Sequence, residues 1–333
     1  IGEAFSVATY VVGGSTYAIV TSSSENGVQL VDVSDPANIG ATDSEIDGQN
    51  GFAELQGARG VAIYTIGAST YAIVASRGDN GVQVIDVSDP YDLVATDKVN
   101  NGNNGAELKN AVDVATYVIG SSTYAIVACE DDGVQVIDVS DPSNLVVEGH
   151  MADSGSLMLN GASGVATFVI GGATYAVVAS KTDNGVQVLD VSDPSALSAT
   201  STVQDGVNGG LFNGASAVSI LELYGSTYAL VTSRDDHSVY VIDVSDPSNP
   251  VLAGRAVDGE SGFDRLAGAS GIATFQRADG IYAIVAGYDE NGVQIMKLAS
   301  VFMPPPLLPP PLSSPPSLPP SSPPPSLPPP SPP

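Results

Sequence analysis

The chain has 333 residues, with 10 Lys or Arg against 37 Asp or Glu, which gives a formal net charge of −27. This charge argues against nucleic acid and anionic membrane surfaces as partners, because neutralising phosphates needs Lys and Arg. The single cysteine, Cys129, excludes an intrachain disulfide, and no apolar run reaches the roughly 18 residues of a membrane-spanning helix.

One five-residue sequence, Asp-Val-Ser-Asp-Pro, recurs along the chain. It begins at Asp32, Asp86, Asp138, Asp190 and Asp243, so the steps are 54, 52, 52 and 53 residues. A Tyr-Ala pair marks the same units and extends them to six, with its tyrosine at Tyr17, Tyr71, Tyr124, Tyr175, Tyr228 and Tyr282. A period of this length is typical of propellers and other repeat architectures.

The second unit indicates the internal design. Ala58 to Ile66 alternates apolar residues and predicts a first strand, and Thr70 to Ser76 predicts a second that is apolar on both faces. Asn80-Gly81 predicts a hairpin turn, because this pair readily adopts positive φ. Val82 to Val87 predicts a third strand, ended by a proline that cannot donate to a ladder. Leu93 to Val99 predicts a more polar fourth strand.

Four short antiparallel strands in each repeat predict an all-β, six-bladed β-propeller. Its middle strands are apolar on both faces, as expected where each blade packs between two neighbours. A parallel β-helix is the alternative, but its coils are shorter and lack antiparallel hairpins. The expected blades are 1–50, 51–104, 105–156, 157–209, 210–263 and 264–302, followed by a proline-rich tail at 303–333.

These repeats resemble the LVIVD-repeat family of β-propellers. The likeness rests on Val84-Ile85-Asp86-Val87-Ser88-Asp89-Pro90 and its equivalents, each preceded by a segment such as Tyr71-Ala72-Ile73-Val74-Ala75. It extends from Ser6 to Ser300 and recurs in register. The resemblance implies a propeller fold and a surface or extracellular protein, but it implies no particular activity.

The sixth unit departs from the pattern. It contains Gly292-Val293-Gln294-Ile295-Met296-Lys297 but no Asp-Pro stop and no clear fourth strand. The chain opens directly on a first strand, Phe5 to Val12, so no spare strand precedes it. Three alternatives remain open: a three-stranded blade, a fourth strand from the segment after Ser300, or a strand from another molecule.

Residues 304–333 contain 18 of the 24 prolines and otherwise only Ser and Leu. Proline fixes φ and lacks an N–H, so this tail is expected to be polyproline II or disordered, and at about 3.1 Å per residue it would span roughly 90 Å. It could be a stiff spacer or, less readily without Lys or Arg, a ligand of proline-binding domains.

A third interpretation rests on a resemblance. The Ser-Pro-Pro and Ser-Pro-Pro-Pro blocks resemble hydroxyproline-rich, extensin-like glycoproteins of plants and algae, which implies secretion, proline hydroxylation and O-linked glycans. The candidate modified residues are Pro304, Pro305, Pro306, Pro309, Pro310, Pro311, Pro315, Pro316, Pro319, Pro320, Pro323, Pro324, Pro325, Pro328, Pro329, Pro330, Ser317 and Ser326.

The sequence gives no candidate catalytic or cofactor-binding residue. Both histidines are expected to be exposed, His150 on an outer strand and His237 in a solvated hairpin turn. No nucleotide-binding or nucleophile motif occurs. The Asp32 series recurs once per blade before Ser-Asp-Pro, so each carboxylate is expected to cap its own turn. An enzyme would need acids and bases that break the repeat symmetry, and the sequence analysis identifies none.

Acidic hairpins are the remaining candidate sites. Clustered carboxylates suit Ca²⁺, but Asp and Asn also favour turns without any ion, so both interpretations stay open. The residues concerned are Asp79, Asp131, Asp132, Asp183, Asp235, Asp236, Asp289 and Glu290.

We therefore expect a non-catalytic structural glycoprotein of the cell surface or extracellular space. Its expected partners are other copies of itself, in a fibre, surface hair or wall layer, and O-linked glycans on the tail, without nucleic acid or membrane insertion. The alternative is an adhesive module that binds a glycan or protein on its loops, such as Asp47 to Gln56. Because the chain begins with Ile1, it is expected to be a processed form or a segment of a longer precursor.

Overall fold

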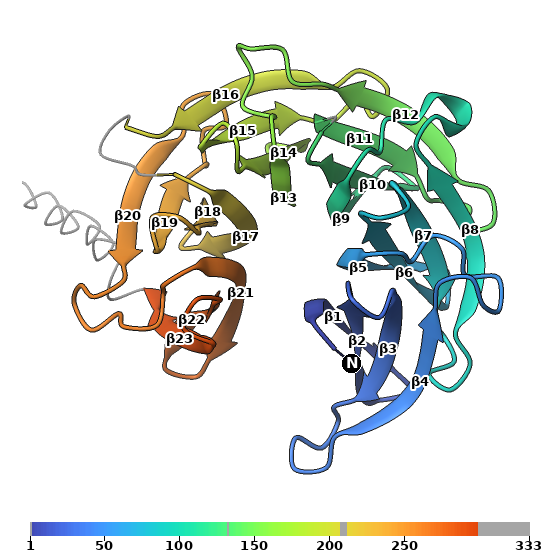
Figure 1. Ribbon diagram of the computed structural model, residues 1–333. Coiled ribbons are helices and arrows are strands. Elements are labelled where there is room, and N and C mark those ends of the chain that lie inside the picture. Colours follow the sequence, from blue (N-terminus) through green and yellow to red (C-terminus); the bar gives the residue numbers. More distant parts are fainter. Residues whose placement is uncertain (1, 132, 207–211, 299–333) are drawn as a thin grey trace, which may run out of the picture.

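The computed structural model describes residues 2–131, 133–206 and 212–298. Within these residues, six antiparallel sheets stand side by side around a central axis and form an open arc (Figure 1). The prediction of an all-β, six-bladed propeller is confirmed. The tail predicted at 303–333 and Asp132 lie outside the described residues. No helix in the described part of the chain is long and apolar enough to cross a membrane.

Each of the first five sheets has four strands in sequence order. Sheet 1 consists of β1 (Ala4–Val12), β2 (Ser15–Ser22), β3 (Gly27–Asp32) and β4 (Gly40–Ile46). Sheet 2 consists of β5 (Ala58–Ile66), β6 (Ser69–Ser76), β7 (Gly81–Asp86) and β8 (Val94–Asn100). Sheet 3 consists of β9 (Ala111–Ile119), β10 (Ser122–Cys129), β11 (Gly133–Asp138) and β12 (Val146–Met151). Sheet 4 consists of β13 (Ala162–Ile170), β14 (Ala173–Ser180), β15 (Gly185–Asp190) and β16 (Ser198–Gln204). Sheet 5 consists of β17 (Ala215–Leu223), β18 (Ser226–Ser233), β19 (Ser238–Asp243) and β20 (Val251–Val257). Sheet 6 consists of β21 (Ala269–Arg277), β22 (Gly280–Gly287) and β23 (Gly292–Lys297).

The observed elements follow local sequence signals closely. β5 has the predicted bounds, and the fourth strand β8 begins one residue later than expected. Asn80 adopts φ 58° in the turn between β6 and β7, as predicted for Asn-Gly. Across β5 and β6, Tyr64 pairs with Tyr71, and their rings stack with centroids 5.5 Å apart. A short 3-10 helix at Asn103–Gly105 is an element that the sequence analysis did not predict.

The apolar core lies between the sheets. Each sheet has a back face, which points toward the preceding sheet, and a front face, which points toward the next sheet. Ile73 and Val84 on the front face of sheet 2 pack with Val127 and Ile137 of sheet 3, and all four are 0% exposed. Four further cores of this kind join the other consecutive sheets. The arc is therefore held together by five sheet-to-sheet cores.

The Asp-Val-Ser-Asp-Pro turns have the predicted local role. Asp86 Oδ1 accepts a hydrogen bond from the Ser88 N–H at 2.9 Å, and the same bond occurs at Asp32, Asp138, Asp190 and Asp243. The Ser88 hydroxyl in turn accepts a bond from the Thr70 N–H of β6 at 2.9 Å. The prediction that these carboxylates cap their own turns is confirmed.

The buried glutamine of the Gly-Val-Gln sequence connects strands that the sequence analysis did not link. Gln135 is 0% exposed, and its Nε2 donates to the carbonyls of Val136, Glu148 and Gly149. Its Oε1 accepts from the Glu107 N–H at 3.0 Å, in the loop that precedes β9. One side chain thus joins β11, the bulged β12 and the inter-blade loop.

Candidate functional site

A polar hollow of about 340 Å³ lies where the hairpin turns and inter-blade loops of sheets 1, 2 and 3 meet. Its lining includes Asn26, Arg59, Arg77, Asn80 and Asn110. The hairpin asparagines are there because positive φ is required at these turns, with φ 55° at Asn26 and 58° at Asn80. The inner strand β5 contributes Arg59, and the turn between β6 and β7 contributes Arg77.

Two guanidinium groups share one carboxylate beside this hollow. Arg77 holds Glu130 through its Nε at 2.9 Å and a terminal nitrogen at 2.8 Å, whereas Arg59 stands 3.9 Å from the same carboxylate. Arg59 lies over the ring of Phe5, 4.6 Å from the centroid. Its Nε is buried and has no hydrogen-bond partner among the described residues. Burial lowers the pKa of Arg59, and Glu130 opposes this effect.

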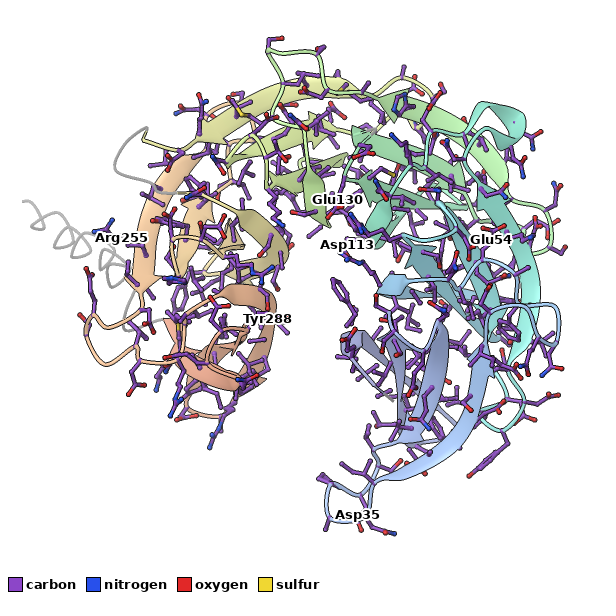
Figure 2. All side chains as sticks on the ribbon, viewed as in Figure 1. Asp35, Glu54, Asp113, Glu130, Arg255 and Tyr288 are labelled. Carbon is purple, nitrogen blue, oxygen red and sulfur yellow. The ribbon has the colours of Figure 1, made fainter. Side chains whose placement is uncertain are left out.

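Asp113 is a second charged residue on an inner strand, β9 (Figure 2). Its carboxylate accepts a hydrogen bond from the Val165 N–H of the next sheet at 2.9 Å. It packs against Gly60 of the previous sheet, where an added Cβ would lie 2.6 Å from Asp113 Oδ1. Burial raises the pKa of Asp113 to about 6, although backbone hydrogen bonds partly oppose this. The carboxylate is therefore hydrogen-bonded to sheet 4 and lies close against sheet 2.

These charged groups were not predicted from the sequence. Arg59 occupies the repeat position that holds Ser163 in sheet 4, and Asp113 occupies the position of Gly60 and Gly164 in sheets 2 and 4. Both residues could have been found because each differs from the residues at the same position of the other repeats. Such departures are obvious only once the inner strands have been aligned position by position.

No described residue packs over the back face of sheet 1 as a preceding sheet does elsewhere. Val7 is 59% exposed, whereas the equivalent Val61, Val114 and Val165 are 8%, 5% and 4% exposed because a preceding sheet covers them. Ile39 follows the same rule, with 60% exposure against 4% at Leu93. This face thus presents the apolar surface that elsewhere forms a sheet-to-sheet core.

No described sheet packs over the front face of sheet 6 either. Val293 is 57% exposed and Ile295 is 54% exposed, whereas Val82 and Val84 at the equivalent positions of sheet 2 are both 0% exposed. In the described part of the chain β23 is the outer strand of sheet 6, since no fourth strand pairs with it. Figure 1 shows the opening of the arc between β1 and β21. The two uncovered faces lie on either side of this opening.

Several acidic hairpin residues contact the loop that enters their own sheet. Asp79, Asp183 and Asp236 accept bonds from the N–H groups of Gln56, Asn160 and Asn213. Asp131 pairs with Lys109 at 2.8 Å, while Asp235 and Asp289 lie beside Gly214 and Gly268. Glu290 is buried at one oxygen, which has no partner among the described residues. In the part of the chain that the structure describes, no three acidic, histidine or cysteine side chains could hold a metal ion together.

The histidines lie on the predicted elements but are less exposed than expected. His150 is on the outer strand β12 and is partly buried. His237 occupies the hairpin between β18 and β19, where its Nδ1 accepts a hydrogen bond from the Gly268 N–H at 2.8 Å. The expectation of a solvated turn residue is wrong for His237, because the loop leading into sheet 6 packs against it. The prolines and serines predicted to be modified lie outside the described residues.

Comparison with known families identifies the repeats. The LVIVD repeat matches residues 58–100, 114–153, 169–205 and 221–258, which correspond to sheets 2 to 5. The chain therefore belongs to the β-propellers that carry LVIVD repeats. No curated protein matches the sequence.

Solved structures share the fold at low sequence identity. A functionally unknown protein from Desulfotomaculum acetoxidans DSM 771 is 13% identical, with a TM-score of 0.61 over 90% of this chain and 84% of its own. The major allergen Mala s 1 of Malassezia sympodialis is 12% identical, with a TM-score of 0.57 over 85% of this chain and 88% of its own. In all, 686 chains match, and a fold this common does not select a function.

Proposed function

We propose that the chain is a non-catalytic structural subunit of an extracellular fibre, surface hair or wall layer. The front face of sheet 6 in one copy docks on the back face of sheet 1 in the next. The observation that carries this proposal is the exposure of Val7 and Val293, at 59% and 57%, where equivalent valines are almost completely buried. At each of the five sheet-to-sheet cores, the front face of one sheet packs against the back face of the next, and the proposed contact joins the same two faces.

A second copy fits these faces better than closure of the arc within one chain. Closing the opening would require the five packed cores to rotate, and closely packed interiors resist such rearrangement. Another copy can cover each face without moving any core. The contact joins two different surfaces and is therefore heterologous, which gives an open helical assembly unless the rotation between copies closes a ring.

The tail adds a separate support for an extracellular structural role. Residues 304–333 contain only Pro, Ser and Leu, and a polyproline II segment is stiff and lacks internal hydrogen bonds. Hydroxylation and O-glycosylation of its prolines would coat this segment and place the protein in the secretory route. This part of the proposal rests on composition, and peptide mass spectrometry of native material covering residues 301–333 tests it. Unmodified prolines would contradict it.

The assembly is tested by analytical ultracentrifugation of the full chain over a range of concentrations. We expect the wild type to form concentration-dependent oligomers, and Val7→Asp or Val293→Asp alone to remain monomeric. Val11→Asp is the matched control, because Val11 lies on the same strand and is 64% exposed, but the equivalent Val118 and Val169 are also 60% and 54% exposed. This control should assemble normally.

Mixing the two monomeric variants tests the head-to-tail geometry. Val7→Asp keeps an intact sheet 6 and Val293→Asp keeps an intact sheet 1, so one good contact remains between them. We expect a dimer containing one copy of each variant, and no larger species. A wild type that stays monomeric at its highest soluble concentration, or a mixture that stays monomeric although the wild type assembles, would overturn the proposed docking.

A further inference from the structure

The hollow between the turns of sheets 1, 2 and 3 is lined by hydrogen-bond donors. Asn26 Oδ1 accepts from the Gly57 N–H and Asn80 Oδ1 accepts from the Asn110 N–H, each at 2.8 Å. These bonds fix the orientation of both amides. Their Nδ2 groups donate to no described residue, so they remain available to a ligand in the hollow that both residues line.

Arg59 brings a cation that the shared Glu130 carboxylate neutralises only in part. Arg77 engages Glu130 through two nitrogens, at 2.9 and 2.8 Å, while Arg59 approaches that carboxylate only at 3.9 Å. The buried Nε of Arg59 lacks a partner among the described residues, and unsatisfied buried donors are rare because they are costly. The guanidinium is held against Phe5 at 4.6 Å, which restricts its position.

This arrangement is specific to one position of the arc. The residues equivalent to Arg59 in sheets 4, 5 and 6 are Ser163, Ser216 and Ser270, so the inner strand also forms with a serine at this position. A chain with 10 basic residues and a net charge of −27 nevertheless places two arginines beside this hollow. A packing role alone does not require a cation there.

We infer that the hollow binds a small carboxylate ligand, with Arg59 and the amides of Asn26 and Asn80 as donors. A planar carboxylate can accept two parallel hydrogen bonds from one guanidinium group, and such charge-assisted pairs are among the strongest hydrogen bonds in proteins. The volume of about 340 Å³ lies at the lower end of the range for small-molecule sites. A uronic acid sugar and an acidic amino acid both provide this chemistry.

Titration calorimetry of the full chain with glucuronate, glucose, glutamate and acetate tests the site. We expect glucuronate or glutamate to bind and glucose not to bind. If only the sugar acid binds, the hollow recognises hydroxyl groups as well, and if glutamate binds equally, the carboxylate alone is recognised. Absence of heat with all three carboxylates at millimolar concentration would overturn the inference.

Three variants separate the site from a general charge effect. Arg59→Ser introduces the residue of three sister sheets and is expected to weaken binding by about tenfold or more. Lys181→Ser removes the same charge from sheet 4, at the turn position that corresponds to Arg77, and should leave binding unchanged. Glu130→Gln removes the competing carboxylate and should strengthen binding, an increase that a merely destabilised protein would not show. Equal weakening by the two serine variants, or weaker binding by Glu130→Gln, would overturn the assignment to Arg59.

Discussion

His237 Nδ1 accepts a hydrogen bond from the Gly268 N–H at 2.8 Å and so connects the β18–β19 hairpin of sheet 5 to the loop entering sheet 6. Asn26, Asn80 and Asn184 make the equivalent bond between earlier sheets, at 2.8, 2.8 and 3.0 Å. The imidazole therefore replaces an amide oxygen in a contact that is repeated along the arc. Sheet-to-sheet connection thus depends on these turns as well as on the apolar cores.

Replacing His237 by Asn is expected to preserve stability, because Asn provides the same acceptor and tolerates the positive φ of 52° found there. His237→Ala should lower the free energy of unfolding by about 1–2 kcal/mol, since the Gly268 N–H loses its partner and alanine is strained at this φ. Chemical denaturation measures both variants. Equal loss in the two would show that the hydrogen bond contributes nothing.

Asp113 makes stability depend on pH. Its pKa is raised from 3.8 to about 6, chiefly by burial, so the folded protein binds this proton more tightly than the unfolded chain. The free energy of unfolding should therefore fall as pH rises from about 4 to about 6. Above that range the loss stays constant, at no more than about 3 kcal/mol relative to low pH. Asp113→Asn can still accept the Val165 bond but carries no charge.

The measurement compares the free energies of unfolding of wild type and Asp113→Asn at pH 5 and pH 7.5. We expect the variant to gain stability relative to the wild type as pH increases. Glu54, Asp79 and Asp183 also have pKa values raised mainly by burial, but they are present in both proteins and cancel in the comparison. A pH-independent difference would contradict the role assigned to Asp113.

Gly60 permits the close approach of sheets 2 and 3. An added Cβ would lie 2.5 Å from the Asp113 Cα, so Gly60→Ala must push the inner strands apart. We expect a loss of about 1–3 kcal/mol in unfolding free energy, typical of overpacking. Gly40→Ala is the control, because nothing lies within 4 Å of a Cβ built there. Thermal unfolding distinguishes the two, and equal melting temperatures would contradict the prediction.

Gln135 and Gln294 occupy the same repeat position with different surroundings. Gln135→Leu should cost about 2–3 kcal/mol, because the Glu107 N–H and the carbonyls of Glu148 and Gly149 lose a buried partner. Gln294 donates only to the Ile295 carbonyl, and its buried Oε1 has no partner among the described residues. Gln294→Leu should therefore change the denaturation midpoint little, and a loss equal to that of Gln135→Leu would sink this account.

The sequence by itself determined the repeat, the class of fold and most of the local structure. β5 begins and ends where alternation and the following turn predicted, because these signals act over a few residues. The Asp86-Val-Ser88 turn could also be predicted, since its hydrogen bond joins neighbours two residues apart. Calcium binding and tail modification stay predictions.

Only the tertiary structure decided which apolar positions are covered. Val7 and Val61 are the same residue in the same repeat position, yet one is 59% exposed and the other 8%. No local pattern distinguishes them, because burial is supplied by a sheet about fifty residues away. The meeting of Arg59, Arg77 and Glu130 likewise depends on packing between sheets 2 and 3. Local signals fix strands and turns, whereas the charged cluster and the uncovered faces arise from the order in which the sheets pack.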